Sequence, residues 1–260
     1  MNEPRAKKSL GQNFLQDKNI ARKIVDAVQI GSGDRVIEIG PGPGMLTSFI
    51  LKAGPAELTL IEKDDYLARE RADEAALQPV PVTVLNTDAL KIDWSAYSAP
   101  CKVCGNLPYN VASPLMWDIV SQAGGLVRAV FMIQKEVGER ICAKPSTSAY
   151  GALSVWMQSF CVPRLEFIVP PQVFKPRPKV HSAVLSFTPL PPEERVQKPA
   201  VLSYILKMFF QQRRKQLGGI LRSNGYEDAI LEPHGINPME RPENLSVAQY
   251  KALAENFLTR

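Results

Sequence analysis

The feature that most constrains the fold of this chain is the regular alternation of short apolar runs with helix-length segments. The first four runs are RVIEI at 35–39, ELTLIE at 57–62, VTVLN at 82–86 and KVCG at 102–105. Strands spaced in this way form parallel sheets, because a crossover helix returns the chain to the starting edge. The sequence therefore predicts an α/β domain with a mostly parallel sheet.

Three further apolar runs extend the predicted sheet to seven strands. AVFMIQ at 129–134 supplies the fifth, and residues 165–169 and 182–187 supply two more. The loop between the last two contains four prolines, at positions 170, 171, 176 and 178. Proline lacks an amide donor and has a fixed φ, so this loop is neither a helix nor a central strand.

A change in composition marks a domain boundary near residue 190. The segment TPLPPEERVQKP at 188–199 combines four prolines with charged residues, as linkers do. Residues 201–221 have a helical pattern, and Ser246 with Gln249 fits a capping box that opens a last helix. We predict an α/β domain with a basic N-terminal arm at 1–190, a linker at 188–199 and a small all-helical domain at 200–260.

Composition excludes several classes of protein. The chain has 260 residues, 45% hydrophobic and 22% charged, which is typical of a globular protein with room for two unequal domains. Its apolar runs fall short of the roughly 20 residues that a membrane span needs, so we expect a cytoplasmic protein. Cys101 and Cys104 form a CxxC without a second ligand pair, which favours buried, reduced thiols in a strand over a metal site.

The positive charge of the chain is unevenly distributed. The formal net charge is +5, yet residues 164–222 alone carry eleven Lys and Arg against three Glu. The first 23 residues add six basic side chains against two acidic ones. Such clustering suits a polyanionic partner but also occurs on ordinary solvated faces, so charge alone leaves nucleic-acid binding open.

A glycine-rich turn, GPGPG at 40–44, directly follows the first predicted strand and precedes a predicted helix, MLTSFILKAG. Glycines at such a turn allow positive φ and let a ligand approach the backbone. NAD enzymes, P-loop proteins and methyltransferases all have turns of this kind. The chain has no GK[ST] pair, which excludes a P-loop, and its two prolines remove amides that a pyrophosphate would need.

Two acids at the ends of the next strands define the ligand further. Glu62 ends the second strand, 18 residues after Gly44, where a carboxylate accepts both ribose hydroxyls. Asp88 closes the third strand and is a candidate partner for an adenine amine. Either acid alone is commonly a surface residue or a helix cap. Together with the glycine turn they indicate an adenosine without phosphates, of which S-adenosylmethionine is the common example.

The fourth strand ends in Asn106-Leu107-Pro108-Tyr109, where ligands of such sheets bind. An aromatic exocyclic amine is a poor nucleophile, because its lone pair is delocalised into the ring. The Asn106 side-chain oxygen and a carbonyl of the Leu107-Pro108 turn could each accept a hydrogen bond from one N–H group of this amine. The lone pair of the amine would then be directed toward a methyl donor. Tyr109 would stack on the base, and His181 and His234 lie away from this motif, which needs no strong base.

A paired base cannot offer its amine in this way, so the target must be unpaired or flipped out. A second aromatic side chain would then clamp the other face of the base. Phe174, in PPQVFKPRPK, is our candidate, although its spacing fits a core phenylalanine almost equally well.

Six segments of the chain resemble the KsgA-type ribosomal RNA adenine dimethyltransferases. They are GQNFL at 11–15, EIGPGPGMLT at 38–47, NLPYN at 106–110, QKEV at 134–137, PPQVFKPRPKV at 170–180 and RRK at 213–215. The resemblance runs from about Arg5 to the last helix. EIGPGxG and NLPY are specific to the wider adenine-methylating superfamily, whereas the proline-rich loop, RRK and the later NLSVAQY point to this family within it.

The resemblance implies a Rossmann-like class I methyltransferase domain with a helical C-terminal domain. It implies transfer of two methyl groups from S-adenosylmethionine to N6 of each of two adjacent adenines in a hairpin loop near the 3′ end of small-subunit (16S) rRNA, during ribosome biogenesis. The product of the cofactor would be S-adenosylhomocysteine. The partner would be the small ribosomal subunit, with no membrane involved, and we expect a monomer.

The resemblance also assigns roles by position. Asn13 and Leu15 would close over the cofactor, Gly40 would line its methionine side, and Glu62 would hold the ribose. Asp88 would bind the adenine amine, Asn106 would serve cofactor and target, and Tyr109 and Phe174 would sandwich the target base. We expect RNA contacts from the basic side chains Lys7, Lys8, Lys175, Arg177, Lys179, Arg213, Arg214 and Lys215.

The sequence departs from the family at one position, where His181 replaces the Asp of PKVDSAV. This removes any acidic role there and leaves the cofactor and acceptor motifs intact.

Three alternatives remain. The first is a large-subunit (23S) rRNA adenine methyltransferase of the antibiotic-resistance type, which the RRK and NLSVAQY motifs disfavour. The second is a ribosome-assembly or mitochondrial transcription factor that kept the fold but acts by docking, which the intact GPGPG and NLPY disfavour. The third, a DNA adenine methyltransferase, usually carries a DNA-reading domain that this sequence lacks.

Overall fold

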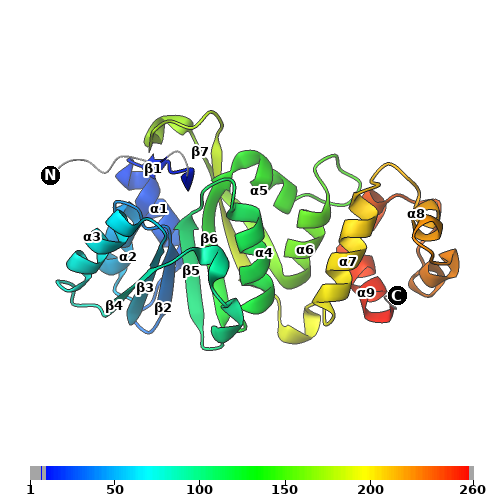
Figure 1. Cartoon of the computed structure of the whole chain (residues 1–260), viewed down its shortest axis with the longest axis horizontal. Helices are drawn as coiled ribbons and strands as arrows, with labels where there is room; N and C mark the ends of the chain where they lie inside the picture. The colour runs from blue at the N-terminus through cyan, green and yellow to red at the C-terminus, as the bar shows by residue number, and fades with distance from the viewer. Residues whose placement is uncertain (1–6, 8–9, 258–260) are drawn as a thin grey trace. The chain divides into compact units, whose positions relative to one another are not determined.

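The computed structural model describes residue 7 and residues 10–257, and it divides the chain into two compact units (Figure 1). The sheet unit consists of Met1–Gly138 and Arg164–Pro189, and the helical unit consists of Glu139–Pro163 and Leu190–Arg260. Each unit is therefore built from two separate stretches of the chain.

A seven-stranded sheet forms the core of the sheet unit, in the order β4-β3-β2-β5-β6-β9-β7. The five strands from β4 to β6 pair in parallel and follow one another in this order in Figure 1. Strand β9 pairs antiparallel with β6. The predicted mostly parallel sheet is confirmed. The strands are β2 (Arg35–Ile39), β3 (Glu57–Glu62), β4 (Val82–Asn86), β5 (Cys101–Asn106), β6 (Leu126–Gln134), β7 (Cys161–Val169) and β9 (Ser182–Pro189).

A small second sheet ties the N-terminal arm to the proline-rich loop. Strand β1 (Phe14–Leu15) pairs antiparallel with β8 (Phe174–Lys175), and the Gln16 amide donates to the Val173 carbonyl at 2.8 Å. The loop therefore holds a two-residue strand and a 3₁₀ turn, Pro171–Val173, rather than a helix or a central strand. This small sheet fixes the C-terminal end of the arm.

Three helices of the sheet unit connect parallel strands, and another, α1, precedes β2 and shows why the helices form where they do. Asp17 caps it by accepting the amides of Asn19 and Ile20, and its residues 21, 24, 25 and 28 are buried at helical spacing. These side chains join a core built on Ile50, Leu58 and Leu60. The helices are α1 (Lys18–Val28), α2 (Met45–Ala53), α3 (Asp65–Ala75), α4 (Ala112–Gln122) and α5 (Lys135–Ile141), of which α5 continues into the helical unit.

The helical unit contains α6 (Ala152–Phe160), α7 (Pro199–Phe210), α8 (Leu217–Ser223) and α9 (Val247–Asn256). The helical pattern predicted over 201–221 is interrupted, because the chain turns at residues 211–216 between α7 and α8. The predicted capping box is confirmed: Ser246 Oγ accepts the Gln249 amide at 3.2 Å, and Gln249 Oε1 accepts the Ser246 amide at 2.9 Å.

The helical unit includes residues 139–163, which the sequence prediction placed in the first domain. Helix α6 packs against α7 and α9, and it buries Val155, Trp156, Met157 and Phe160. A helix with so large a buried apolar surface needs partners on several sides, and these come from beyond residue 190. The local sequence of 152–160 gives no sign of which unit it joins.

Two absences concern the described part of the chain. Within residues 7 and 10–257, no helix is long and apolar enough to cross a membrane. Cys101, Cys104 and Cys161 are buried free thiols in strands, as the CxxC interpretation predicted for the first two, and no cluster of metal-ligating side chains occurs among the described residues.

Candidate functional site

A cavity of about 130 Å³ lies at the carboxyl ends of β2, β3, β4 and β5. This edge is where parallel α/β sheets bind ligands. The N-terminal arm, the glycine turn, the ends of β3 and β4 and the NLPY segment all line it. The lining residues are Leu10–Phe14, Ile39, Gly40, Gly42, Ile61–Lys63, Thr87–Leu90, Asn106–Val111 and Leu115.

The glycine turn leaves no free amide for a phosphate. Gly40, Gly42 and Gly44 have φ of 66°, 55° and 84°, the left-handed region that favours glycine. Their amides donate to the Ile61 carbonyl, the Glu62 carboxylate and the Pro41 carbonyl, respectively. Pro41 and Pro43 have no amide hydrogen. All five backbone positions are therefore engaged or lack a donor, which suits a ligand without a pyrophosphate.

Arg71, from α3, supports the back of this turn. Its side chain is 6% exposed, and its Nη1 donates to the Pro43 carbonyl at 3.0 Å. A Cβ at Gly44 would lie only 1.9 Å from that nitrogen. Gly44 is thus required both by its φ and by the packing of Arg71.

Glu62 is buried at the end of β3 with its carboxylate fixed by two backbone amides. Its Oε1 accepts the Asp64 amide at 2.8 Å and its Oε2 accepts the Gly42 amide at 3.1 Å. Burial raises the pKa of Glu62 above its ordinary value, although these two amides favour the charged form. The carboxylate is held in place beside the cavity before any ligand arrives.

A second buried acid, Glu38, lies on β2 just before the glycine turn. It is 1% exposed, and Thr47 Oγ1 donates to it at 2.6 Å. Burial raises the pKa of Glu38 to about 7, with the Thr47 hydrogen bond and the Arg71 charge opposing that rise and the Glu62 charge adding to it. Glu38 does not line the cavity.

Asp88 faces the cavity after β4 and is paired with Lys63. Lys63 Nζ donates to one carboxylate oxygen at 2.7 Å, and the Leu90 amide donates to the other at 3.1 Å. The Lys63 hydrogen bond lowers the pKa of Asp88, although partial burial opposes it. A ligand amine that bound Asp88 would therefore share the carboxylate with Lys63.

Asn106 ends β5 with its amide orientation fixed by the arm. Its Nδ2 donates to the Asn13 carbonyl at 2.9 Å, which leaves Oδ1 as the acceptor of this side chain. In the following turn, the Pro108 carbonyl accepts the amides of Val111 and Ala112 at the start of α4. Among the described residues, no amide of α4 donates to the Leu107 carbonyl. Two acceptors, Asn106 Oδ1 and the Leu107 carbonyl, thus belong to adjacent residues that line the cavity.

Tyr109 lines the cavity and is held by a distant residue. Its hydroxyl lies 2.8 Å from Ser182 Oγ, at the start of β9. Ser182 is fully buried, and burial raises the pKa of the Tyr109 phenol although this hydrogen bond opposes the rise. The ring is therefore anchored at its polar end.

Two of the predicted catalytic and cofactor-binding residues are not among those that line the cavity. Leu15 and Phe174 are each 5% exposed, are partners in the β1–β8 sheet and belong to the hydrophobic core. The position of Phe174 in this structure is that of a core phenylalanine, which was the alternative interpretation. Its role as a base clamp stays a prediction.

The predicted RNA-binding residues have different environments. Lys7 donates to Asp64 at 2.9 Å, whereas Lys8 lies outside the described residues. Lys175, Arg177 and Lys179 are exposed on and after β8. All three belong to the sheet unit, as the cavity does.

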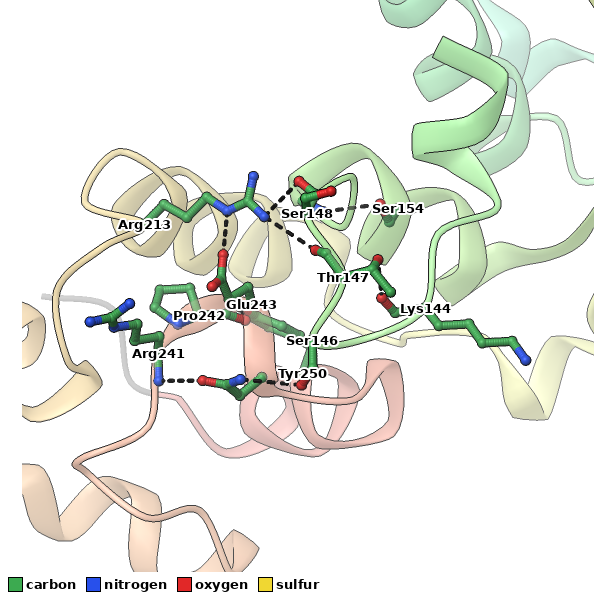
Figure 2. Close-up of polar contacts among 12 residues, drawn as sticks. Lys144, Ser146, Thr147, Ser148, Ser154, Arg213, Arg241, Pro242, Glu243 and Tyr250 are labelled. Atoms are coloured by element: carbon green, nitrogen blue, oxygen red, sulfur yellow. Dashed lines mark hydrogen bonds and ion pairs between the residues drawn. The ribbon is translucent and has the colours of Figure 1, made fainter. Parts of the chain in front are cut away.

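Arg213 is engaged within the helical unit, as Figure 2 shows. Its Nε donates to Glu243 at 2.6 Å, and its Nη2 donates to the carbonyls of Thr147 and Ser148 at 3.3 and 2.8 Å. The guanidinium thus joins the turn after α7 to the loop before α6 and to Glu243. Arg214 and Lys215, by contrast, have no side-chain ion pair among the described residues.

Sequence reasoning missed four residues that shape the cavity. Asp64 and Lys63 immediately follow Glu62, so their position at a strand end was a usable signal. Arg71 and Ser182 gave no local signal, because each acts on a residue that is distant in sequence.

Comparison with known proteins identifies the family. The family model "Ribosomal RNA adenine dimethylase" matches residues 3–258. The chain belongs to this family. The family member Ribosomal RNA small subunit methyltransferase A of Oleidesulfovibrio alaskensis is 60% identical over 256 residues, which cover 96% of this chain and 91% of that protein. Its counterpart in Lawsonia intracellularis is 45% identical, over 98% of this chain and 94% of that protein.

Solved structures agree with the family assignment. A dimethyladenosine transferase from Plasmodium falciparum matches with a TM-score of 0.79 at 25% identity, covering 92% of this chain and 95% of that chain. The 23S rRNA methyltransferase ErmE matches with a TM-score of 0.68 at 22% identity, over 94% and 98%, and shows the fold alone. This chain has the seven-stranded, mostly parallel sheet of the class I methyltransferase fold, as the resemblance implied.

Proposed function

We propose that this chain is an S-adenosylmethionine-dependent enzyme that dimethylates N6 of two adjacent adenosines in a hairpin loop near the 3′ end of 16S rRNA, during ribosome biogenesis. The names of its relatives support the small-subunit substrate. The observation that carries the proposal is the cavity itself. There, two acceptors for an exocyclic amine stand at the same sheet edge as the glycine turn and the fixed Glu62 carboxylate.

The residues of the cavity fit S-adenosylmethionine. Glu62 would accept the ribose hydroxyls, Asp88 the adenine amine, and Gly40 would border the methionine part. Asn13 would cover the cofactor from the arm, and Leu15 would act through the backbone of β1. The absence of a free amide in the glycine turn supports a ligand without phosphates, since a pyrophosphate needs such donors.

When bound, S-adenosylmethionine supplies an electrophilic methyl group on a sulfonium. Asn106 Oδ1 and the Leu107 carbonyl would accept hydrogen bonds from the two N–H groups of the target amine. These hydrogen bonds would localise the lone pair of the amine and align it for attack. Pro108 gives this turn its fixed shape. Tyr109 would stack on the base. The proton leaves to solvent after transfer, so the site needs no general base.

The RNA would be held by basic side chains. Lys175, Arg177 and Lys179 lie on and after β8 in the sheet unit, and Arg214 and Lys215 lie in the helical unit. Exposed cations are suited to phosphate contacts. We further propose that the enzyme acts as a cytoplasmic monomer.

The test uses small ribosomal subunits that lack the modification, with labelled S-adenosylmethionine. We expect label at two neighbouring adenosines of 16S rRNA. The Asn106→Ala variant should transfer at least about 100-fold more slowly, because one preorganised acceptor is lost. It should stay folded, with its free energy of unfolding lowered by about 1 kcal/mol through the lost hydrogen bond to the Asn13 carbonyl. Label confined to large-subunit RNA or to DNA would contradict the proposal and favour an alternative methyltransferase. Specific subunit binding without any transfer would favour a docking factor.

A further inference from the structure

The segment of the arm from Leu10 to Asn13 forms one wall of the cavity and is fixed at both ends. At its C-terminal end, the β1–β8 pairing and the Asn106–Asn13 hydrogen bond hold it. At its N-terminal end, Lys7 and Gln12 both donate to Asp64, at 2.9 and 3.3 Å. The Lys7 amide also donates to Gln12 Oε1 at 2.8 Å. The N-terminal anchor therefore depends on a single carboxylate.

Asp64 itself is fixed independently of the arm. It caps α3 by accepting the Tyr66 amide at 3.1 Å, and its own amide donates to the Glu62 carboxylate. Its side chain is 3% exposed, whereas that of Lys7 is 52% exposed. One end of the ion pair is rigid and buried, and the other can exchange with water.

The ionisation of Asp64 favours this contact. Burial alone would raise the pKa of its carboxyl group, but the hydrogen bonds from Lys7 and Gln12 outweigh burial and lower it. The carboxylate is charged at neutral pH, and Lys7 supplies the opposite charge at contact distance.

We propose that Asp64 is a positioning residue that latches the arm over the cavity, so that its contact with Lys7 and Gln12 controls the release of the bound adenosyl ligand. The identity of that ligand rests on the proposed function, but the latch does not. Because the Asp64 amide also holds Glu62, the same residue links closure of the arm to the carboxylate that faces the ribose.

The experiment measures the dissociation rate constant of S-adenosylhomocysteine from the full chain by stopped-flow displacement. Asp64→Asn keeps a helix cap but removes the charge, and Lys7→Met removes the other partner. We expect each variant to release the ligand about threefold to fivefold faster, and the double variant no faster than either single one. Arg22→Met, which breaks the exposed Arg22–Asp26 ion pair of α1, is the matched control and should change nothing.

Salt separates a latch from a general loss of stability. Raising the ionic strength should speed release from the natural chain toward the rate of the variants and should leave the variants unaffected. Equal release rates for all four proteins, or additive effects of the two substitutions, would overturn the proposal.

Hydrogen exchange tests the latch without any ligand. The Leu10 amide donates to the Lys7 carbonyl and should exchange faster in Asp64→Asn, whereas the Gln16 amide, bound to Val173, should keep its rate. If the natural chain bound no S-adenosylhomocysteine, the proposed function would fail, and this exchange comparison would still decide the latch. Unchanged exchange at Leu10 would overturn it.

Discussion

At the scale of single residues, Glu38 links the ionisation of the core to the glycine turn. Its pKa is raised from 4.5 to about 7, chiefly by burial, so the folded chain binds a proton that the unfolded chain releases between these values. The stabilising contribution of this proton is fully present below pH 4.5 and is lost as the pH rises through 7. Raising the pH from about 5 to about 8 should therefore lower the free energy of unfolding.

The Glu38→Gln variant should remove this dependence, because glutamine is neutral and still accepts the Thr47 hydroxyl. We expect the variant to gain about 2–3 kcal/mol in the free energy of unfolding, relative to the natural chain, between pH 5 and pH 8. Urea denaturation at the two pH values measures this difference. A constant difference between the two proteins would show that Glu38 is already ionised in the folded chain.

Single residues also show what sequence could predict about the site. Sequence reasoning placed Glu62, Asp88 and Asn106 at one site because each lies at or just after the end of a strand, and strand ends converge at one edge of a parallel sheet. All three line the cavity. Phe174 could not be placed in the same way, since its position depends on the pairing of β8 with the distant β1. Ser182 was missed because its partner, Tyr109, lies 73 residues away.

At the scale of elements, the packing of the glycine turn against Arg71 can be tested by substitution. Gly44→Ala places a Cβ in left-handed backbone and 1.9 Å from Arg71 Nη1, so Arg71 must give up the Pro43 carbonyl. Gly54→Ala is a matched control, because its φ is also left-handed but open space surrounds it. We expect Gly54→Ala to cost about 1–2 kcal/mol of unfolding free energy and Gly44→Ala clearly more. Equal costs would mean that Arg71 moves freely.

The elements also show where sequence patterns stop being informative. Seven strands were predicted because hydrophobic runs and flanking turns are local properties. The break between α7 and α8 was not, since residues 211–216 include good helix formers such as Arg and Lys. Within that segment, Arg213 reaches the loop before α6, so a tertiary contact coincides with the break in the helix.

At the scale of the whole molecule, the basic residues of the helical unit divide into structural and candidate RNA-binding groups. Replacing both Arg214 and Lys215 with Gln should lower the salt dependence of subunit binding, by about 1–2 in the slope of log K against log salt. The thermal midpoint and S-adenosylhomocysteine affinity should stay constant. An unchanged slope would place the RNA surface elsewhere.

Arg213→Gln should behave differently from that pair. It removes the contacts to Glu243 and to two carbonyls, so we expect a loss of about 1–3 kcal/mol in unfolding free energy. Thermal denaturation of the variant measures this loss. A stable Arg213→Gln protein with weakened subunit binding would return Arg213 to the RNA-binding group.

The division of the helical unit into two stretches has a consequence for biosynthesis. Residues 139–163 leave the translating ribosome before residues 164–189, which complete the sheet unit, and before residues 190–260, which contain the partners of α6. The apolar side chains of α6, including Trp156 and Phe160, must therefore wait for a later part of the chain. A nascent chain arrested near residue 190 would present this helix without α7 and α9, and would be a natural target for chaperones.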